Sequence, residues 1–489
     1  MGFYRFLVAA GSFSSLFLLL FNASLSAQNS ALQEISRLDS LTQSDSLTID
    51  KIFIIGNRKT RNSIIERELS ISEGKIVARS NLDELLEQER NKLLNTSLFL
   101  DVDFNVIPVN DERIDIILRL YERWYLFPIP IFELADRNFN EWWTNQGRDL
   151  SRINYGLKLY QYNVRGRNET LRLTAQFGFT RQFQLYYSFP FIDKSQKLGL
   201  TLFGDFSENN NLNFQTIDHR QRDLDSLDVN SWIMRRTRFG ASFTYRRSFY
   251  NRHHFSFNFL KNRIRDTVAI LNPDYFLNGR SLQKYFRFSY TFRRDLRDFT
   301  AYPLNGFFLE ASIDKLGLGI FDDINQLEMN ILYSRYMNLG KNFYFSTNFG
   351  AKTTFPDRQP YFNNNAIGYN PFVLRGYELY VVEGQHFLIN RNTLKMKLFS
   401  LEQKLHNLIN IKQFQTFPIA VYLKTYLDNG YVFSNTPVPE NIIDYTNELI
   451  YGYGFGLDIV TFYDIVFRWE YSFNAEGESG LFFGIKSEF

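Results

Sequence analysis

The side chains that most often carry out catalysis or bind metals are few in this sequence, and they are not grouped. The chain has no cysteine, so it offers neither a thiolate nucleophile nor a thiolate metal ligand. The adjacent pair Asp218-His219 is the one catalytic candidate, but such a pair in a polar loop is usually only hydrated. We therefore predict no enzymatic activity, no metal site and no cofactor, because no metal-binding spacing links the five histidines: His219, His253, His254, His386 and His406.

The dominant feature of the sequence is an alternation of apolar and polar residues from about residue 125 to the final residue. Within residues 465–473 every odd position is apolar or aromatic, whereas the even positions include Arg468 and Glu470. Such alternation predicts a β-strand with one apolar face and one hydrated face. Sixteen segments carry it: residues 124–134, 152–162, 169–180, 183–189, 198–206, 236–247, 255–262, 284–293, 306–315, 326–338, 342–354, 392–401, 418–427, 450–459, 465–474 and 480–489.

Alternating segments of about ten residues are typical of an all-β transmembrane barrel. The 51 Phe and 29 Tyr residues suit strands and the aromatic girdles at the membrane surfaces. A mean hydropathy of −0.28 is expected when half of each strand faces water. We therefore predict a 16-stranded antiparallel barrel in contact with outer-membrane lipids. The net charge of +3 is too small to indicate a nucleic-acid partner.

The connections between the predicted strands alternate in length. Residues 164–167, 190–196 and 248–252 form short turns, whereas residues 207–233, 267–282 and 356–391 form long loops. Short periplasmic turns and long outer loops are the pattern of bacterial outer-membrane barrels. An even number of strands places both ends of the barrel on the periplasmic side.

The N-terminus has the features of an export signal. Arg5 precedes an apolar stretch at residues 6–21, and Leu25-Ser-Ala27 fits a small-residue cleavage site. The alternative, a membrane anchor, is disfavoured by the short apolar core. We assign residues 1–27 to a signal peptide and the Ser-, Gln- and Asp-rich residues 28–48 to a flexible leader.

Residues 49–123 have the pattern of a small α+β domain. We predict a strand at residues 49–55, a helix at 60–69, a second helix capped by Ser80, and strands at 102–109 and 113–122. The predicted order is β-α-α-β-β. The barrel then occupies residues 124–489.

Two sets of residues give the chain a family resemblance. The order of the small domain, with Gly56-Asn57, Thr60 and Arg67-Glu-Leu69, resembles a POTRA domain. The long loop at residues 356–391 contains Val373-Leu-Arg-Gly-Tyr377. With it, the chain resembles the BamA/TamA-like outer-membrane assembly and two-partner-secretion superfamily, whose sixth outer loop folds into the lumen and carries an Arg-Gly-aromatic motif. The positions that match it are Leu374, Arg375, Gly376 and Tyr377.

The resemblance implies an electrostatic anchor for this loop. In the family, acidic groups on the barrel wall hold the arginine, and a lumenal guanidinium can bind a carboxylate with two parallel hydrogen bonds. Asp428-Asn-Gly430 matches the family's Asp-x-Gly, so Asp428 is the expected partner, next to Gly430. Further matches are Asp298, Pro303 and Gly306 in one turn, the glycines Gly452, Gly454 and Gly456, and a C-terminal assembly signal: Gly480, Leu481, Phe483, Ile485 and Phe489.

The sequence also departs from the family in two ways. Asn392-Thr393 stands where the family often places a glutamate near the loop arginine, and only one POTRA-like domain is found. Other charged residues fall on the predicted inner faces of strands, where we expect them to be hydrated: Arg172, Arg287, Lys395, Arg468 and Glu470.

The resemblance implies a protein that assembles clients in the outer membrane of a Gram-negative-type bacterium. The POTRA-like domain would lie in the periplasm and bind extended client polypeptides by β-augmentation. The first and last strands would form a weak seam, since Pro128 and Pro130 remove backbone donors from the first strand. Two alternatives stay open: a translocation pore for one dedicated polypeptide, and an accessory or scaffold subunit in a complex with other assembly subunits.

Overall fold

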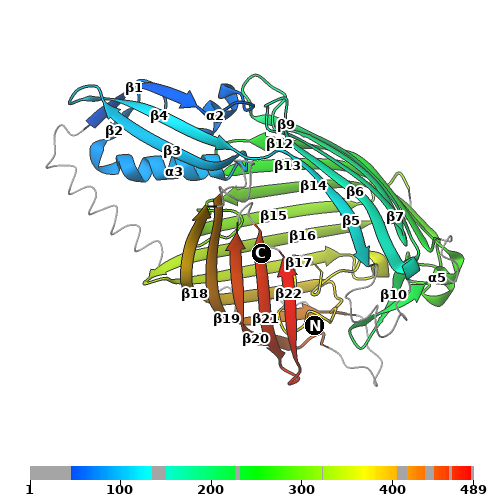
Figure 1. Ribbon diagram of the computed structural model, residues 1–489. Helices are drawn as coiled ribbons and strands as arrows, with labels where there is room; N and C mark the ends of the chain where they lie inside the picture. The colour runs from blue at the N-terminus through cyan, green and yellow to red at the C-terminus, as the bar shows by residue number, and fades with distance from the viewer. Residues whose placement is uncertain are drawn as a thin grey trace. The chain divides into compact units, whose positions relative to one another are not determined.

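The computed structural model of the chain describes residues 46–134, 150–225, 232–321, 323–369, 371–404, 416–435, 445–461 and 465–485. These residues form two compact units, a small N-terminal domain and a large sheet (Figure 1). The predicted signal peptide and most of the predicted leader lie outside the described residues. No helix in the described part is both long and apolar enough to cross a membrane.

The N-terminal domain is a four-stranded sheet with the strand order β2-β1-β4-β3 and two α-helices. Strands β1 and β4 are parallel, and the other neighbours are antiparallel. Ile49, Leu93 and Ile116 are fully buried in its core. Its elements are β1 (Ser46–Ile55), α2 (Asn62–Glu68), β2 (Ile76–Ala78), the short 3-10 helix η1 (Arg79–Asn81), α3 (Leu82–Leu94), β3 (Phe99–Pro108) and β4 (Arg113–Glu122).

The predicted order β-α-α-β-β is wrong in one detail, since it omits β2. This strand pairs with the start of β1, where Ser46 lies opposite Ala78, so residues 46–48 belong to the sheet and not to a flexible leader. A strand of three residues is too short to show alternation. The predicted Ser80 cap is also wrong, because η1 precedes α3 and the N-cap position is Asn81.

The large unit contains the predicted 16-stranded antiparallel sheet, and each of the sixteen predicted segments overlaps one of its strands. Neighbouring strands follow the chain, except that a hairpin is inserted between β9 and β12. The strands are β5 (Leu126–Leu134), β6 (Ile153–Val164), β7 (Glu169–Gly178), β8 (Thr180–Phe189), β9 (Leu198–Asn209), β12 (Met234–Arg246), β13 (Asn251–Ile264), β14 (Leu282–Asp295), β15 (Gly306–Leu316), β16 (Gln326–Gly340), β17 (Phe343–Phe355), β18 (His386–Lys404), β19 (Thr416–Phe433), β20 (Leu449–Thr461), β21 (Val466–Asn474) and β22 (Ser479–Ile485).

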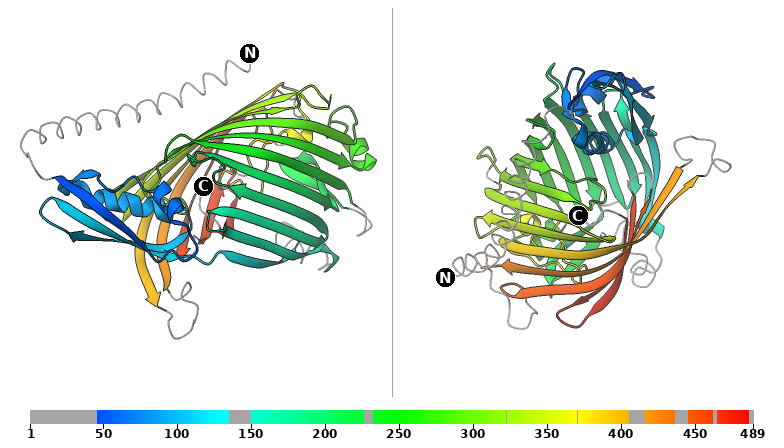
Figure 2. Two further views of the ribbon diagram at one scale, coloured as in Figure 1. Left: turned by 90° about the horizontal axis from the view of Figure 1, so that it is seen from above. Right: turned by 90° about the vertical axis from the view of Figure 1, so that its left-hand side faces the viewer.

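The sheet curls, so that one face is turned inward and the other outward (Figure 2). Along β20 the outward residues Tyr451, Tyr453 and Phe455 are exposed, whereas the inward residues Gly452 and Gly454 are buried. Strands β5 and β22 are the two edges of the sheet. The described residues contain no pairing between these edges, so the ring of strands is not closed in this structure.

The longest described connections, which join β9 to β12, β13 to β14 and β17 to β18, gather at one end of the strands, which we call the loop end; we call the opposite end the turn end. The predicted loop at residues 207–233 contains an additional hairpin of β10 (Asn211–Ile217) and β11 (Arg220–Asp225), and the predicted loop at 267–282 contains most of α5 (Asp266–Leu271). Together with residues 356–385, the inner loop, these segments share an apolar core that we call the loop-end cap: Leu212, Ile233, Met234, Ile264, Val268, Ala269, Tyr275 and Phe276, with Phe214, Leu224, Tyr361 and Phe362 packed against them.

Strand β18 begins at His386, six residues before the predicted start at Asn392. The intervening residues Phe387, Leu388 and Ile389 are all buried, whichever way they point. Phe387 and Ile389 pack in one cluster with residues of the inner loop. Because both faces are covered there, the segment lacks the alternation by which the other strands were predicted.

Candidate functional site at the inner face of the sheet

The inner loop packs against the inner face of β18, β19 and β20. Ile367, Leu374 and Tyr377 of the loop are at most 1% exposed. They form one cluster with residues of these strands, including Ile389, Val432 and Ile450. A buried loop needs partners for its polar groups. The buried part of this loop includes a charged residue, Arg375.

Arg375 is the centre of the site, and Asp428 on β19 is its main partner. The Arg375 Nη2 donates to Asp428 Oδ1 at 2.6 Å and Nε donates to Oδ2 at 2.7 Å, so the pair is bidentate. The backbone N–H of Arg375 also donates to Oδ2, at 3.3 Å. Arg375 is 5% exposed and Asp428 is 0% exposed. The structure thus brings together Arg375 of the loop motif and Asp428 of the Asp-x-Gly motif, the pair that the family resemblance implied.

The remaining donors of Arg375 contact neighbouring strands. Nη2 donates to Thr393 Oγ1 on β18 at 3.0 Å, and Nη1 lies 3.6 Å from Glu470 Oε1 on β21. The guanidinium carbon lies 4.0 Å from the centre of the Tyr426 ring. Glu470 therefore supplies the second carboxylate that Asn392-Thr393 lacks.

Glu470 also connects Arg375 to a second buried cation. Lys424 Nζ lies 3.0 Å from Glu470 Oε1 and 2.6 Å from Asp458 Oδ1, and Lys424 is fully buried. Arg468 Nε lies 3.2 Å from Glu470 Oε2. We call this set the inner charge network; it balances three cations against three carboxylates and consists of Arg375, Lys424, Arg468, Asp428, Asp458 and Glu470.

The expectation that the inward charges are hydrated is wrong for two of them, Glu470 and Lys395. Glu470 and Lys395 are 4% and 2% exposed. Arg375 of the inner loop lies against Glu470, and Tyr302 in the turn between β14 and β15 lies against Lys395. Arg287 pairs with Asp314 at 2.7 Å. Arg172 lies between the rings of Tyr160 and Tyr186, with its guanidinium carbon 5.6 and 5.1 Å from their centres.

Three inward glycines of β20 make room for this arrangement. A Cβ atom at Gly452 would overlap the carbonyl oxygen of Arg375, and one at Gly454 would lie 2.5 Å from the Tyr426 hydroxyl oxygen. A Cβ atom at Gly456 would lie 3.0 Å from Cε of Lys424. The glycine pattern noted in the sequence thus has a steric cause, because each position faces a member of the site.

We expect Gly452→Ala to displace the inner loop and to destabilise the folded sheet by about 1–3 kcal/mol, the usual cost of overpacking. The measurement is the temperature at which the folded band is lost on semi-native gels. Gly204→Ala is the matched control, because a Cβ atom at Gly204 meets open space. Equal melting of the two variants would contradict the steric role of Gly452.

The residues after Arg375 connect the loop to the last hairpin of the sheet. Gly376 has a φ of +93°, and a Cβ atom there would lie 2.6 Å from the carbonyl oxygen of Phe473 on β21. Tyr377 donates its hydroxyl to Glu476 at 2.8 Å, and Tyr380 donates to Glu478. Glu476 and Glu478 lie in the turn between β21 and β22, so the inner loop is held next to the edge strand β22.

Glu378 is a third carboxylate beside Arg375. It accepts hydrogen bonds from the backbone N–H of Gly376 at 2.7 Å and from the Ser472 hydroxyl at 3.2 Å. Burial, with a smaller contribution from the nearby Glu470, raises the pKa of Glu378 to about 7. The carboxylates whose contacts hold the Arg375 guanidinium are Asp428 and Glu470.

The remaining predicted site residues lie away from the inner charge network. Leu481, Phe483 and Ile485 of β22 are 71%, 57% and 55% exposed on one face of the strand, and Gly480 is the second residue of the same strand. Phe489 lies outside the described residues. Pro128 and Pro130 lie in β5, opposite Leu159 and Leu157 of β6. Gly430 adjoins Ile367 of the inner loop.

The catalytic candidate Asp218-His219 forms the turn of the β10–β11 hairpin. Nε2 of His219 accepts the backbone N–H of Tyr445 at 2.8 Å, and the two rings stack 4.5 Å apart. The backbone carbonyl of His219 accepts the N–H of Val381 in the inner loop at 2.8 Å. These contacts give His219 a structural part in holding the hairpin over the inner loop. Within the described residues, no group of three metal-binding side chains is present.

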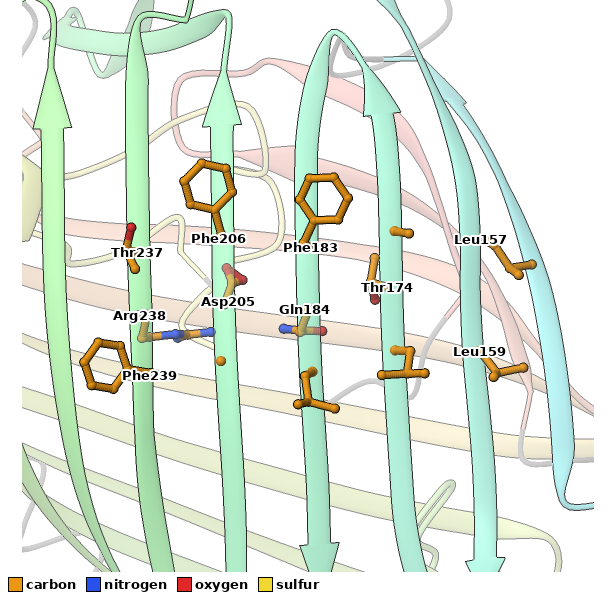
Figure 3. A pocket seen from close by; sticks show the side chains of 14 residues that line it. Leu157, Leu159, Thr174, Phe183, Gln184, Asp205, Phe206, Thr237, Arg238 and Phe239 are labelled. Carbon is orange, nitrogen blue, oxygen red and sulfur yellow. The ribbon is translucent and has the colours of Figure 1, made fainter.

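An apolar hollow of about 670 Å³ lies on the outward face of β6 to β12 (Figure 3). Gly204 leaves the space open between Leu185 and Phe239, which are its cross-strand neighbours. Phe183 and Leu157 border the same hollow. Most of its exposed surface is apolar, as a surface that contacts lipid requires, although its lining also includes Thr174, Gln184, Asp205, Thr237 and Arg238.

Two family models match the sequence in succession. The POTRA model, described as the surface antigen variable number repeat, matches residues 47–123. The model of the Omp85 superfamily domain matches residues 163–386. None of the curated proteins matches the chain.

Solved structures with a similar fold include BamA from Haemophilus ducreyi lacking POTRA domains 1–3. It is 16% identical, with a TM-score of 0.50 over 90% of this chain and 84% of that chain. CdiB from Escherichia coli is 13% identical, with a TM-score of 0.54 over 90% of this chain and 76% of that chain. At these identities the likeness concerns the fold.

Proposed function

Because this chain belongs to the Omp85 superfamily of outer-membrane proteins, we propose that it inserts client β-barrel polypeptides into the outer membrane. Its barrel lies in the outer membrane of a Gram-negative bacterium and its POTRA domain lies in the periplasm. The loop end therefore faces outward and the turn end faces the periplasm. We assign residues 49–123 to the POTRA domain and residues 124–489 to the barrel.

One observation carries the proposal. Loops cover the space that the curled sheet surrounds, whereas the two edge strands of the sheet, β5 and β22, are not paired with each other in the described residues. The inner loop packs against the inner face of β18, β19 and β20, and the loop-end cap forms an apolar core at the loop end. Strands β5 and β22 leave their outer backbone groups without a strand partner in the described residues. An unpaired edge is a template for an added strand, so an incoming client strand can pair there.

The POTRA domain would deliver such clients by the same chemistry. Strand β3 is an edge of the four-stranded sheet and is ten residues long. An extended polypeptide can add to such an edge through main-chain hydrogen bonds, with little dependence on its sequence. Phe489 and the exposed residues of β22 would serve the insertion of this chain itself, as a C-terminal assembly signal.

A dedicated translocation pore is the second candidate, and a polar chamber favours it. The chamber has a volume of about 500 Å³ and lies between β13–β16 and the inner-loop residues Pro371 and Phe372. Ser256, Asn258 and Ser289 are among the polar residues that line it. Displacement of the inner loop would extend this chamber towards the loop end.

Reconstitution into liposomes tests the proposal. We expect the purified protein to accelerate severalfold the folding of a urea-denatured outer-membrane barrel protein, read as a protease-resistant, heat-modifiable band. Empty liposomes give the spontaneous rate. No acceleration, together with ion conductance in planar bilayers, would contradict insertion and support the pore. The absence of both activities would support an accessory subunit.

A further inference from the structure

The turn between β14 and β15 is folded against the inner face of the sheet at its periplasmic end. Asp298 Oδ1 accepts the backbone N–H groups of Phe299 at 2.8 Å and Leu304 at 3.1 Å, which holds the turn in shape. Tyr302 is only 4% exposed and packs in a cluster with Tyr422 and Val466. A turn at the end of a barrel is usually hydrated, so the burial of Tyr302 calls for an explanation.

Tyr302 contacts two charged groups of the inner face. Its hydroxyl donates to Asp458 Oδ2 at 2.9 Å, and Lys395 Nζ lies 4.3 Å from its ring centre. Asp458 is 1% exposed, and its other oxygen pairs with Lys424. Tyr302 is therefore directly attached to the inner charge network.

From Tyr302 the contacts run without interruption to the inner loop. Asp458 binds Lys424 at 2.6 Å, and Lys424 binds Glu470 at 3.0 Å. Glu470 lies 3.6 Å from Arg375 of the loop. On β19 and β20, Asp458 lies opposite Tyr422, whereas Asp428 lies opposite Gly452. These two residue pairs are six positions apart along β19, which corresponds to roughly 20 Å.

We propose that Tyr302 is a positioning residue for the inner loop. It fixes Asp458, and Asp458 sets how Lys424 is shared with Glu470, the second carboxylate of Arg375. The periplasmic turn and the inner loop then belong to one electrostatic unit, and displacement of one weakens the hold on the other. The inference rests on the proposed anchoring of the loop by Arg375, and it adds a route by which a periplasmic event reaches the outer end of the barrel.

The burial of these residues strengthens the electrostatic coupling between them. All five members from Tyr302 to Arg375 are at most 5% exposed, so solvent screens their interactions little. Without the tyrosine hydroxyl, Asp458 loses a hydrogen-bond donor in a site that offers little water, and Lys424 shifts towards it. Glu470 then holds Arg375 less firmly.

Thiol labelling measures the position of the loop. Ala366 of the inner loop is 1% exposed, and the chain has no native cysteine, so Ala366→Cys reports when the loop opens. Labelling with a maleimide is followed in proteoliposomes. We expect Tyr302→Phe to raise the labelling rate severalfold. Tyr344→Phe is the matched control, because this ring packs in the same cluster but lies outside the inner charge network.

A double-mutant cycle separates the coupling from general loosening. Arg375→Lys should raise labelling by itself, and adding Tyr302→Phe should raise it by less than the product of the two single effects. If Arg375→Lys acts and Tyr302→Phe does not, the anchor stands and the proposed coupling is overturned. Independent, multiplying effects, or no effect of either change, also overturn it. Labelling is scored on the heat-modifiable folded band, and Asp458→Asn replaces Tyr302→Phe if the latter does not fold.

Discussion

Arg375→Ala should reduce the folded barrel in the outer membrane to a small fraction of the wild-type level. The substitution leaves Asp428, which is fully buried, without its bidentate partner. Removing one member of a buried ion pair costs about 3–5 kcal/mol, a large part of the stability of an ordinary domain. The fraction of heat-modifiable protein in isolated membranes is the measurement.

Two further variants identify the cause of this loss. Arg375→Lys keeps the charge but has no planar fork, so we expect an intermediate level of folded protein. Replacing both partners by apolar residues, as in Arg375→Met with Asp428→Leu, should be milder than Arg375→Ala, because no unpaired charge is left in the dry site. If the double variant folds as poorly as the single one, the ion pair is not what the loop needs.

The strands could be predicted because their signal is local. Alternation between exposed Tyr451, Tyr453 and Phe455 and buried glycines can be recognised in residues 450–459 without knowing what lies beside the strand. The same reasoning fails where a second layer covers the strand. That is why residues 386–391 of β18 and the β10–β11 hairpin of the loop-end cap were interpreted as loop.

The site could be predicted only in part. The match of Arg375 to Asp428 depended on two motifs 53 residues apart in the chain. Glu470 was assigned to the inner face by alternation, but alternation cannot tell which loop covers that face, so its burial was missed. Lys424 and Asp458 meet because β19 and β20 are neighbouring strands, whereas Tyr302 reaches them from the turn between β14 and β15, which no local pattern predicts.

The seam between β5 and β22 is where we expect the largest effect on function. Pro128 and Pro130 have no N–H group, so β5 cannot build a full ladder towards a neighbour if those positions face it. A pairing that is short of backbone donors is easily opened by a competing client strand.

Locking this seam should abolish client insertion while the barrel stays folded. The chain has no native cysteine, so one cysteine at Ile129 or Ile131 and one at Phe482 or Gly484 give four pairs to screen. A disulfide forms where the two Cα atoms approach to about 4.4–6.8 Å. Insertion is measured in the liposome assay before and after reduction, so that each variant is its own control. Full insertion activity with the crosslink quantitatively formed would rule out entry between β5 and β22, and it would leave the route through the inner loop and the loop-end cap as the one that clients take.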